Sequence, residues 1–192
     1  MTMLLIGLLI FLGAHSVRIF AEPWRQARIA RMGAGAWKGA YSVVSLAGLA
    51  LIVWGYGLAR AVPVDLWAPP VWTRHLSSLL NVVAFVLLAA AYVPRNRIRA
   101  ATGHPMVAGT ALWAVAHLLS NGRLADLVLF GAFLAWAVLD FRAARARDRA
   151  AGVRRAPGTL GGDLAVLAVG TAAAAAFALW LHAPLVGVRP FG

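Results

Sequence analysis

The charged side chains of this chain fall into short clusters that leave long stretches free of Asp, Glu, Lys and Arg. Four such stretches hold 21, 20, 23 and 25 residues, at positions 39–59, 75–94, 100–122 and 164–188. A helix that crosses the hydrocarbon core of a bilayer needs about 20 mostly apolar residues. The spacing therefore predicts membrane-spanning helices, with the charged clusters outside the lipid.

Composition agrees with this interpretation. The chain has 192 residues, of which 62% are hydrophobic, and a formal net charge of +12. This is too apolar for a soluble domain, and the length fits a single transmembrane domain over residues 1–192. The basic residues stand at the ends of apolar runs, so we exclude nucleic acid as a partner and expect contacts with the lipid bilayer. Without cysteine, disulfides and thiolate ligands are excluded.

The pattern predicts an all-α, polytopic membrane bundle of six transmembrane helices, at residues 3–21, 39–59, 75–93, 104–119, 124–141 and 164–186. Residues 22–38 and 142–155 are expected to be basic connections. The first, third and fifth connections, counted with Arg18, hold 14 Lys and Arg, whereas the other side holds four. The positive-inside rule places the 14 in the cytoplasm, so both termini are expected on the non-cytoplasmic side of the cell inner membrane. No basic side chain precedes the first helix, so we do not expect it to be a cleaved signal.

The first predicted helix carries polar side chains in its cytoplasmic half. His15, Arg18 and Glu22 are spaced by three and four residues, so they form one stripe on the helix surface. One interpretation pairs Arg18 with Glu22 and leaves His15 hydrogen-bonded to a neighbour. The other makes His15 a metal ligand, with Arg18 one turn away to pair an anionic group such as a haem propionate.

The fourth predicted helix contains two further histidines. His104 precedes a proline, so it is expected to occupy the capping position of this helix. His117 follows 13 residues later, on nearly the opposite face and about 20 Å away along the axis, so the two cannot share a metal on a straight helix. By depth in the membrane, His15 is closer to His104 than to His117. His75 and His182 are expected at the non-cytoplasmic interface.

The segment from Gly103 to Gly122 resembles the NnrU family. It begins Gly-His-Pro-Met-Val-Ala-Gly-Thr and ends Ala-His-Leu-Leu-Ser-Asn-Gly. The segments Ala14-His15-Ser16 and Leu129-Phe130-Gly131 agree with the same family. Its members are bacterial membrane proteins associated with denitrification and nitric oxide metabolism. A relative in plants and cyanobacteria, the zeta-carotene isomerase, carries haem b and isomerises a cis double bond.

The resemblance implies a cofactor and its ligands. It implies haem b held by His15 and His117, with His104, which matches the histidine of the His-Pro motif, as a further metal candidate. It also implies nitric oxide or an apolar small molecule as the partner of the site. Two departures from the isomerase count against isomerase activity more than against haem binding. These are Gly103 in place of an arginine and the basic residues 142–155 in place of an acidic segment.

Four functions remain open at this point, and no catalytic residue is assigned. The first is a haem-b-binding membrane protein of nitrogen-oxide metabolism, and the second is a redox-regulated isomerase of a cis polyene. The third is a methyltransferase, because the His-Pro-x-x-x-Gly segment also resembles isoprenylcysteine-methyltransferase-like enzymes, although the arginine before His104 and the acidic tail are missing. The fourth is an assembly factor whose histidines serve only packing. No P-loop, G-x-S-x-G or H-E-x-x-H motif points elsewhere.

Overall fold

The computed structural model describes residues 1–190, and within them the chain is built from helices. The elements are α1 (Thr2–Phe20), α2 (Glu22–Met32), α3 (Ala34–Ala61), α4 (Trp72–Tyr92), α5 (Arg97–Thr102), α6 (Pro105–Ser120), α7 (Leu124–Ala150), α8 (Leu160–Ala176), the π-helix η1 (Phe177–Leu181) and α9 (His182–Val186). The predicted all-α fold is therefore confirmed.

Five helical segments are long and apolar enough to cross a membrane. They are α1, α3, α4, α7 and the continuous run Leu160–Val186 formed by α8, η1 and α9. The predicted fourth span corresponds to α6, which is apolar but has only 16 residues and so extends about 24 Å. Large apolar side chains on the outer surface, such as Leu9 at 75% and Trp180 at 69% exposure, need lipid to cover them.

The predicted loop over residues 22–38 is wrong because it is almost entirely helical, and the predicted end of the fifth helix at residue 141 is too early. Residues 22–32 form α2, with Glu22 in its first turn and a proline at its start, and α7 continues to Ala150 instead of ending at 141. Alanine and arginine, which dominate residues 142–150, are strong helix formers in water as well as in lipid. The first charged residues mark where the lipid ends, and the helix itself ends later.

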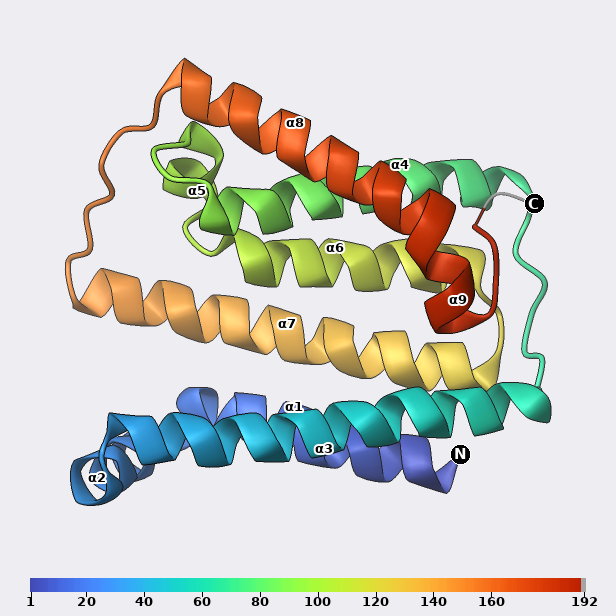
Figure 1. Cartoon of the computed structure of the whole chain (residues 1–192), viewed down its shortest axis with the longest axis horizontal. Helices are drawn as coiled ribbons and strands as arrows, with labels where there is room; N and C mark the ends of the chain where they lie inside the picture. Colours follow the sequence, from blue (N-terminus) through green and yellow to red (C-terminus); the bar gives the residue numbers. More distant parts are fainter. Residues whose placement is uncertain (191–192) are drawn as a thin grey trace.

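The helices form two groups on either side of α7 (Figure 1). One group is the antiparallel pair α1 and α3, and the other contains α4, α6 and α8. The pair packs against the rest of the described bundle mainly through α7. The main hydrophobic core lies at this junction and includes Leu4 and Leu8 of α1, Ile52 of α3 and Leu129 and Phe130 of α7.

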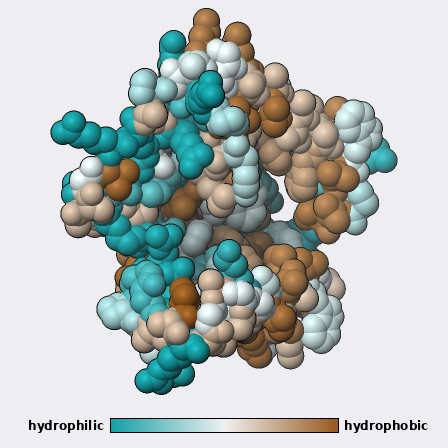
Figure 2. Space-filling model, turned by 60° about the vertical axis from the view of Figure 1, so that its left-hand side comes forward, coloured by the Kyte–Doolittle hydropathy of each residue, from teal (hydrophilic) through white to brown (hydrophobic). Residues whose placement is uncertain are grey.

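The two ends of the bundle differ in charge. The basic elements α2, α5 and the end of α7 lie at the same end of the bundle, whereas the N-terminus and α9 lie at the opposite end (Figure 1). Figure 2 shows hydrophilic side chains gathered on the end that comes forward in that view, beside an apolar flank. This separation of charge from apolar surface fits a bundle that stands across a bilayer.

Candidate functional site

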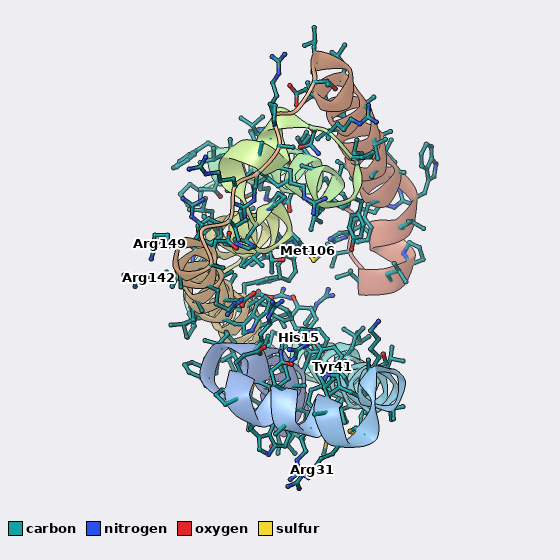
Figure 3. The ribbon with its side chains drawn as sticks, turned by 90° about the vertical axis from the view of Figure 1, so that its left-hand side faces the viewer. His15, Arg31, Tyr41, Met106, Arg142 and Arg149 are labelled. Carbon is teal, nitrogen blue, oxygen red and sulfur yellow. The ribbon has the colours of Figure 1, made fainter. Side chains whose placement is uncertain are left out.

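His15 lies on α1, inside the bundle, between α3 and α7. Its Nδ1–H donates to the carbonyl oxygen of Phe11 at 2.7 Å, so the ring carries its proton on Nδ1 and leaves Nε2 free. The imidazole stacks on the Phe11 ring with centroids 4.2 Å apart. The rings of Tyr41 from α3 and Trp136 from α7 lie 5.2 and 5.9 Å away. Figure 3 shows His15 and Tyr41 on the side of the α1–α3 pair that faces the other helices.

His117 on α6 repeats this arrangement. Its Nδ1–H donates to the carbonyl oxygen of Trp113 at 2.8 Å, again from residue i to residue i−4. Its ring stacks on Phe130 of α7 with centroids 4.5 Å apart, and the Trp113 ring lies 5.2 Å away. Each histidine therefore has one nitrogen fixed by its own helix and one nitrogen available in apolar, aromatic surroundings.

An aromatic layer, formed by the rings of Phe11, Trp113 and Phe133, separates the two histidines. Phe133 of α7 contacts both Phe11 and Trp113, with ring centroids 5.8 and 5.5 Å apart. On α7, the residue beside His15 is Trp136 and the residue beside His117 is Phe130, so the two imidazoles are offset by six residues of that helix. This corresponds to about 9 Å along the bundle axis. His15 and His117 thus approach the same layer from opposite sides.

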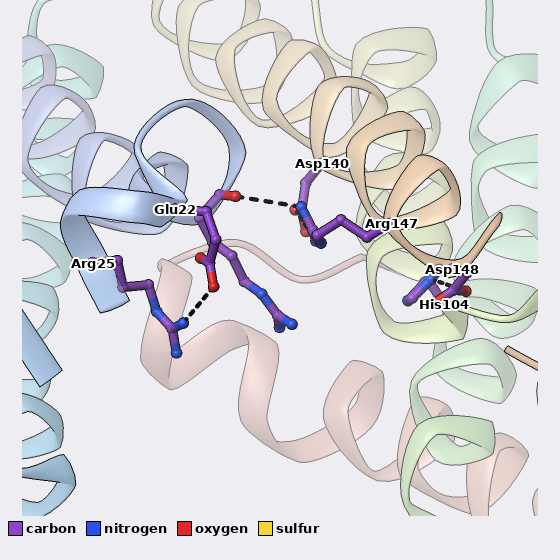
Figure 4. Close-up of polar contacts among 7 residues, drawn as sticks. Glu22, Arg25, His104, Asp140, Arg147 and Asp148 are labelled. Carbon is purple, nitrogen blue, oxygen red and sulfur yellow. Dashed lines mark hydrogen bonds and ion pairs between the residues drawn. The ribbon is translucent and has the colours of Figure 1, made fainter. Parts of the chain in front are cut away.

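His104 belongs to a different cluster, at the end of the bundle where α2, α5 and the end of α7 lie. It occupies the position before α6, as expected, but its side chain does not cap the helix. Instead its Nε2 lies 2.8 Å from Oδ2 of Asp148 near the end of α7 (Figure 4), and Arg155 donates to the same oxygen. Hydrogen bonds from Arg155 and then from His104 hold the pKa of Asp148 below its ordinary value, against the opposing effect of burial. The structure does not bring His104 to His15.

Arg155 also occupies the space that a side chain at position 103, just before His104, would fill. Gly103 has a φ of +79°, and its missing Cβ would lie 3.0 Å from the guanidinium carbon of Arg155. The chain thus places an arginine beside the His-Pro motif from the α7–α8 connection, although residue 103 itself is glycine.

The predicted pair between Arg18 and Glu22 does not form. Glu22 accepts hydrogen bonds from Arg25 at 2.9 Å and from Gln26 at 2.6 Å, and Arg18 has no ion pair within residues 1–190. The carbonyl oxygen of Arg18 accepts a hydrogen bond from Arg147, which joins α1 to the end of α7 (Figure 4). The Arg18 guanidinium nevertheless acts on the Glu22 carboxylate through its charge.

The other two histidines stand apart from the aromatic layer. His75 is exposed at the start of α4, and the Nδ1–H of His182 donates to the carbonyl oxygen of Val188 at 2.7 Å. In the described part of the chain, no three His, Cys, Asp or Glu side chains cluster as a metal site would require.

Sequence reasoning missed a buried polar pair at the end of the bundle that holds the N-terminus and α9. Asp126 is 3% exposed and accepts a hydrogen bond from the Tyr56 hydroxyl at 2.5 Å. Arg60 lies over the Tyr56 ring and donates to the carbonyl oxygen of Val186, so this network links α3, α7 and α9. The two members of the pair are 70 residues apart, and no motif in the sequence connects them.

Comparison with known proteins gives one match. The family model described as NnrU protein matches residues 3–190, which is nearly the whole chain. No curated protein and no solved structure matches it.

Proposed function

Because this chain belongs to the NnrU family, we propose that it is a haem-b-binding integral membrane protein of bacterial nitric oxide metabolism. The observation that carries this proposal is the matching state of His15 and His117. In both, Nδ1–H donates to the i−4 carbonyl oxygen and Nε2 is free. A histidine that ligates iron through one nitrogen usually has the other held by a carbonyl or carboxylate, which fixes the tautomer and the ring orientation.

The surroundings of the two histidines also suit the cofactor. Neutral imidazoles are common haem ligands, and apolar walls exclude water and tune the iron's reduction potential. When bound, haem supplies an iron that takes up a diatomic gas or changes its redox state. His15 and His117 are the residues that would hold it. Binding by both at once requires the rings of Phe11, Trp113 and Phe133 to reorient, because these fill the layer between them.

The proposal includes the membrane arrangement. We place the chain in the cell inner membrane with six crossings and both termini on the non-cytoplasmic side. The positive-inside rule supports this orientation, as does the grouping of α2, α5 and the end of α7 at one end of the bundle. In this arrangement an apolar gas such as nitric oxide reaches the aromatic layer directly from the lipid.

The test is a dithionite-reduced minus oxidised visible spectrum of the detergent-purified protein after supplementation with haem. The wild type is expected to give a b-type spectrum, and His15→Ala and His117→Ala are expected to lose or shift it. His75→Ala is the matched control, because this histidine is exposed at the start of α4. His104→Ala is expected to keep the spectrum, because Nε2 of His104 is already engaged by Asp148.

Two results would contradict the proposal. A wild-type protein without a Soret band would remove haem binding and favour an assembly factor with packing histidines. If the spectrum is lost in His104→Ala but kept in His117→Ala, the protein binds haem, but His104 rather than His117 is a ligand.

A second candidate function is a redox-regulated isomerase of a cis polyene, and one observation favours it. An apolar groove of about 300 Å³ runs between α1 and α7 and reaches Ser16, the residue that follows His15 in the sequence. It is lined by Leu5, Leu9, Leu12 and Ser16 of α1 and by Val128 and Ala132 of α7. Conversion of a cis polyene by the reduced but not by the oxidised protein would support this function, and equal inactivity in both states would reject it.

A further inference from the structure

Helix α2 lies crosswise to the two spans that it connects. Figure 1 shows α2 end-on while α1, α3 and α7 run across the view, and Figure 3, turned by 90°, shows it side-on. The residues at its two ends make this change of direction. The chain leaves α1 through Ala21, at φ −137° and ψ 37°, and enters α3 through Gly33, at φ +85°. A helix in this position lies along the bilayer surface when the spans cross the bilayer.

The side of α2 that faces away from the bundle is basic. Trp24, Arg28 and Arg31 are spaced by four and three residues, so they share one side of the helix, and all three are exposed. Figure 3 shows Arg31 pointing away from the other helices. The opposite side of α2 is partly buried and consists of Glu22, Arg25 and Ile29. The exposed side therefore presents two guanidinium groups and an indole to the surroundings of the protein.

The two exposed arginines have no acidic partner in the described chain. The nearest carboxylate in the sequence, Glu22, is on the other side of α2 and is hydrogen-bonded within that helix. None of the ion pairs within residues 1–190 involves Arg28 or Arg31. The Arg28 guanidinium lies over the Trp24 ring, 5.3 Å from its centroid, and that ring contacts Trp37 of α3 with centroids 5.9 Å apart. This side of α2 can therefore bind an external anion.

The apolar surface next to α2 selects the kind of anion. Phe20, the last residue of α1, is 71% exposed, and Val43, within about three turns of the start of α3, is 68% exposed. Such side chains need acyl chains to cover them. Guanidinium groups bind phosphate, and tryptophan favours the level of the head groups. A phospholipid covers both surfaces at once, whereas a nucleic acid or an acidic protein would cover the arginines alone.

We propose that the exposed side of α2, formed by Trp24, Arg28 and Arg31, binds the head group of an anionic phospholipid. The acyl chains of this lipid lie against the ends of α1 and α3 that adjoin α2. Phosphatidylglycerol is the simplest ligand of this class, and phosphatidylcholine is its neutral counterpart. The inference does not depend on haem binding.

Quenching of a fluorophore on α2 by spin-labelled lipids tests the proposal. The chain has no cysteine, so Ala27→Cys, at an exposed position of α2, carries a single fluorophore. The labelled full-length protein is reconstituted in phosphatidylcholine vesicles that contain a minor fraction of spin-labelled phosphatidylglycerol or spin-labelled phosphatidylcholine. The ratio of the two quenching efficiencies at equal lipid fraction measures the preference for the anionic head group.

The labelled protein is expected to prefer phosphatidylglycerol. Arg28→Gln and Arg31→Gln are each expected to lower the preference by up to about fivefold, as the contribution of one basic residue at an anionic surface predicts. The double variant is expected to have little preference left. Arg74→Gln is the matched control, because this arginine is exposed at the start of α4, at the other end of the bundle, and is expected to leave the preference unchanged. Salt at about 1 M is expected to weaken the preference by screening.

Three results would overturn the inference. Equal quenching by the two lipids would show that α2 does not select an anionic head group, and quenching by neither would show that α2 does not lie at the lipid surface. A preference that survives in the double variant, or that falls as far in Arg74→Gln, would show that the charge of the whole protein attracts the lipid.

Discussion

At the scale of single residues, the cluster of His104, Asp148 and Arg155 joins the start of α6 to the end of α7 and to the connection that follows. Asp148 is its centre, because one carboxylate oxygen receives both the imidazole and the guanidinium. The lowered pKa of Asp148 means that the folded protein favours its charged form. Stability linked to this group is therefore present above its ordinary pKa and is lost as the pH falls through the folded value.

This linkage predicts a pH-dependent effect of Asp148→Asn. The variant is expected to lower the apparent melting temperature in detergent at pH 7 and at pH 5. The difference from wild type is expected to shrink as the pH falls below 3.8, the ordinary pKa, and to vanish below the lower folded pKa, where Asp148 is neutral in the folded and the unfolded chain. Asp65→Asn, at an exposed pair at the other end of the bundle, is the control. A difference that stays constant down to pH 3 would contradict the assigned linkage.

At the scale of elements, α1 and α3 pack with their backbones almost in contact. A Cβ on Gly55 would lie 2.2 Å from the backbone nitrogen of Leu4, and one on Gly48 would lie 2.8 Å from that of Phe11. Small residues at such crossings allow the close approach that stabilises helices in lipid. The G-x-x-x-G formed by Gly35 and Gly39 is not such a crossing, because nothing lies within 4 Å of either added Cβ.

Gly55→Ala is expected to destabilise the protein by about 1–3 kcal/mol, because the methyl group would force the two backbones apart. Gly39→Ala is the matched control on the same helix and is expected to be neutral or stabilising by up to about 1 kcal/mol through helix propensity. Unfolding of the purified protein in increasing dodecyl sulfate, followed by circular dichroism, measures both. Equal stability of the two variants would show that the α1–α3 crossing is looser than the structure has it.

The predictability of these elements follows from what each depends on. The spans were predictable because side chains that contact lipid must be apolar. Three of the four ends of α3 and α4 therefore lie within a few residues of their predicted positions. The start of α3 is the exception, at Ala34 rather than residue 39. The helical state of α2 was not predictable from hydropathy. Hydropathy indicates whether a segment lies in lipid or in water, but not whether its backbone is helical.

The candidate site was predictable only in part. His15 and His117 stood out because histidines are rare inside apolar spans and because both match a family motif. The buried pair of Tyr56 and Asp126 did not, since whether a buried group finds a partner depends on how the helices pack in three dimensions. The same holds for His104 and Asp148, which meet across 44 residues of sequence.

At the scale of the whole molecule, the short helix α6 decides the number of crossings. Its C-terminal connection packs on the one between α3 and α4, where Leu66 N–H donates to the carbonyl oxygen of Gly122 at 2.8 Å. Arg123 and Asp65 pair across the same two connections. Both connections thus lie at one level, which places the two ends of α6 at opposite ends of the bundle and favours six crossings.

The absence of cysteine makes this orientation directly measurable. Single cysteines replacing Arg28 and Arg149 are expected to react with a membrane-impermeant maleimide only after the cytoplasmic face is opened, whereas one replacing Val64 is expected to react in intact spheroplasts. If α6 did not cross, the Arg149 position would lie outside. Labelling of that position in intact spheroplasts would therefore reject the six-crossing arrangement.

The near-isolation of the α1–α3 pair bears on how the protein is made. The pair reaches its remaining contacts mainly through α7, which ends at Ala150, so both helices are synthesised long before their neighbour leaves the ribosome. At roughly 5–20 residues per second, this interval is on the order of 10 s. During that time the α1–α3 hairpin must persist alone in the lipid. The close packing at Gly48 and Gly55 stabilises it. We therefore expect the N-terminal third of the chain to insert as a unit before the later helices pack onto it.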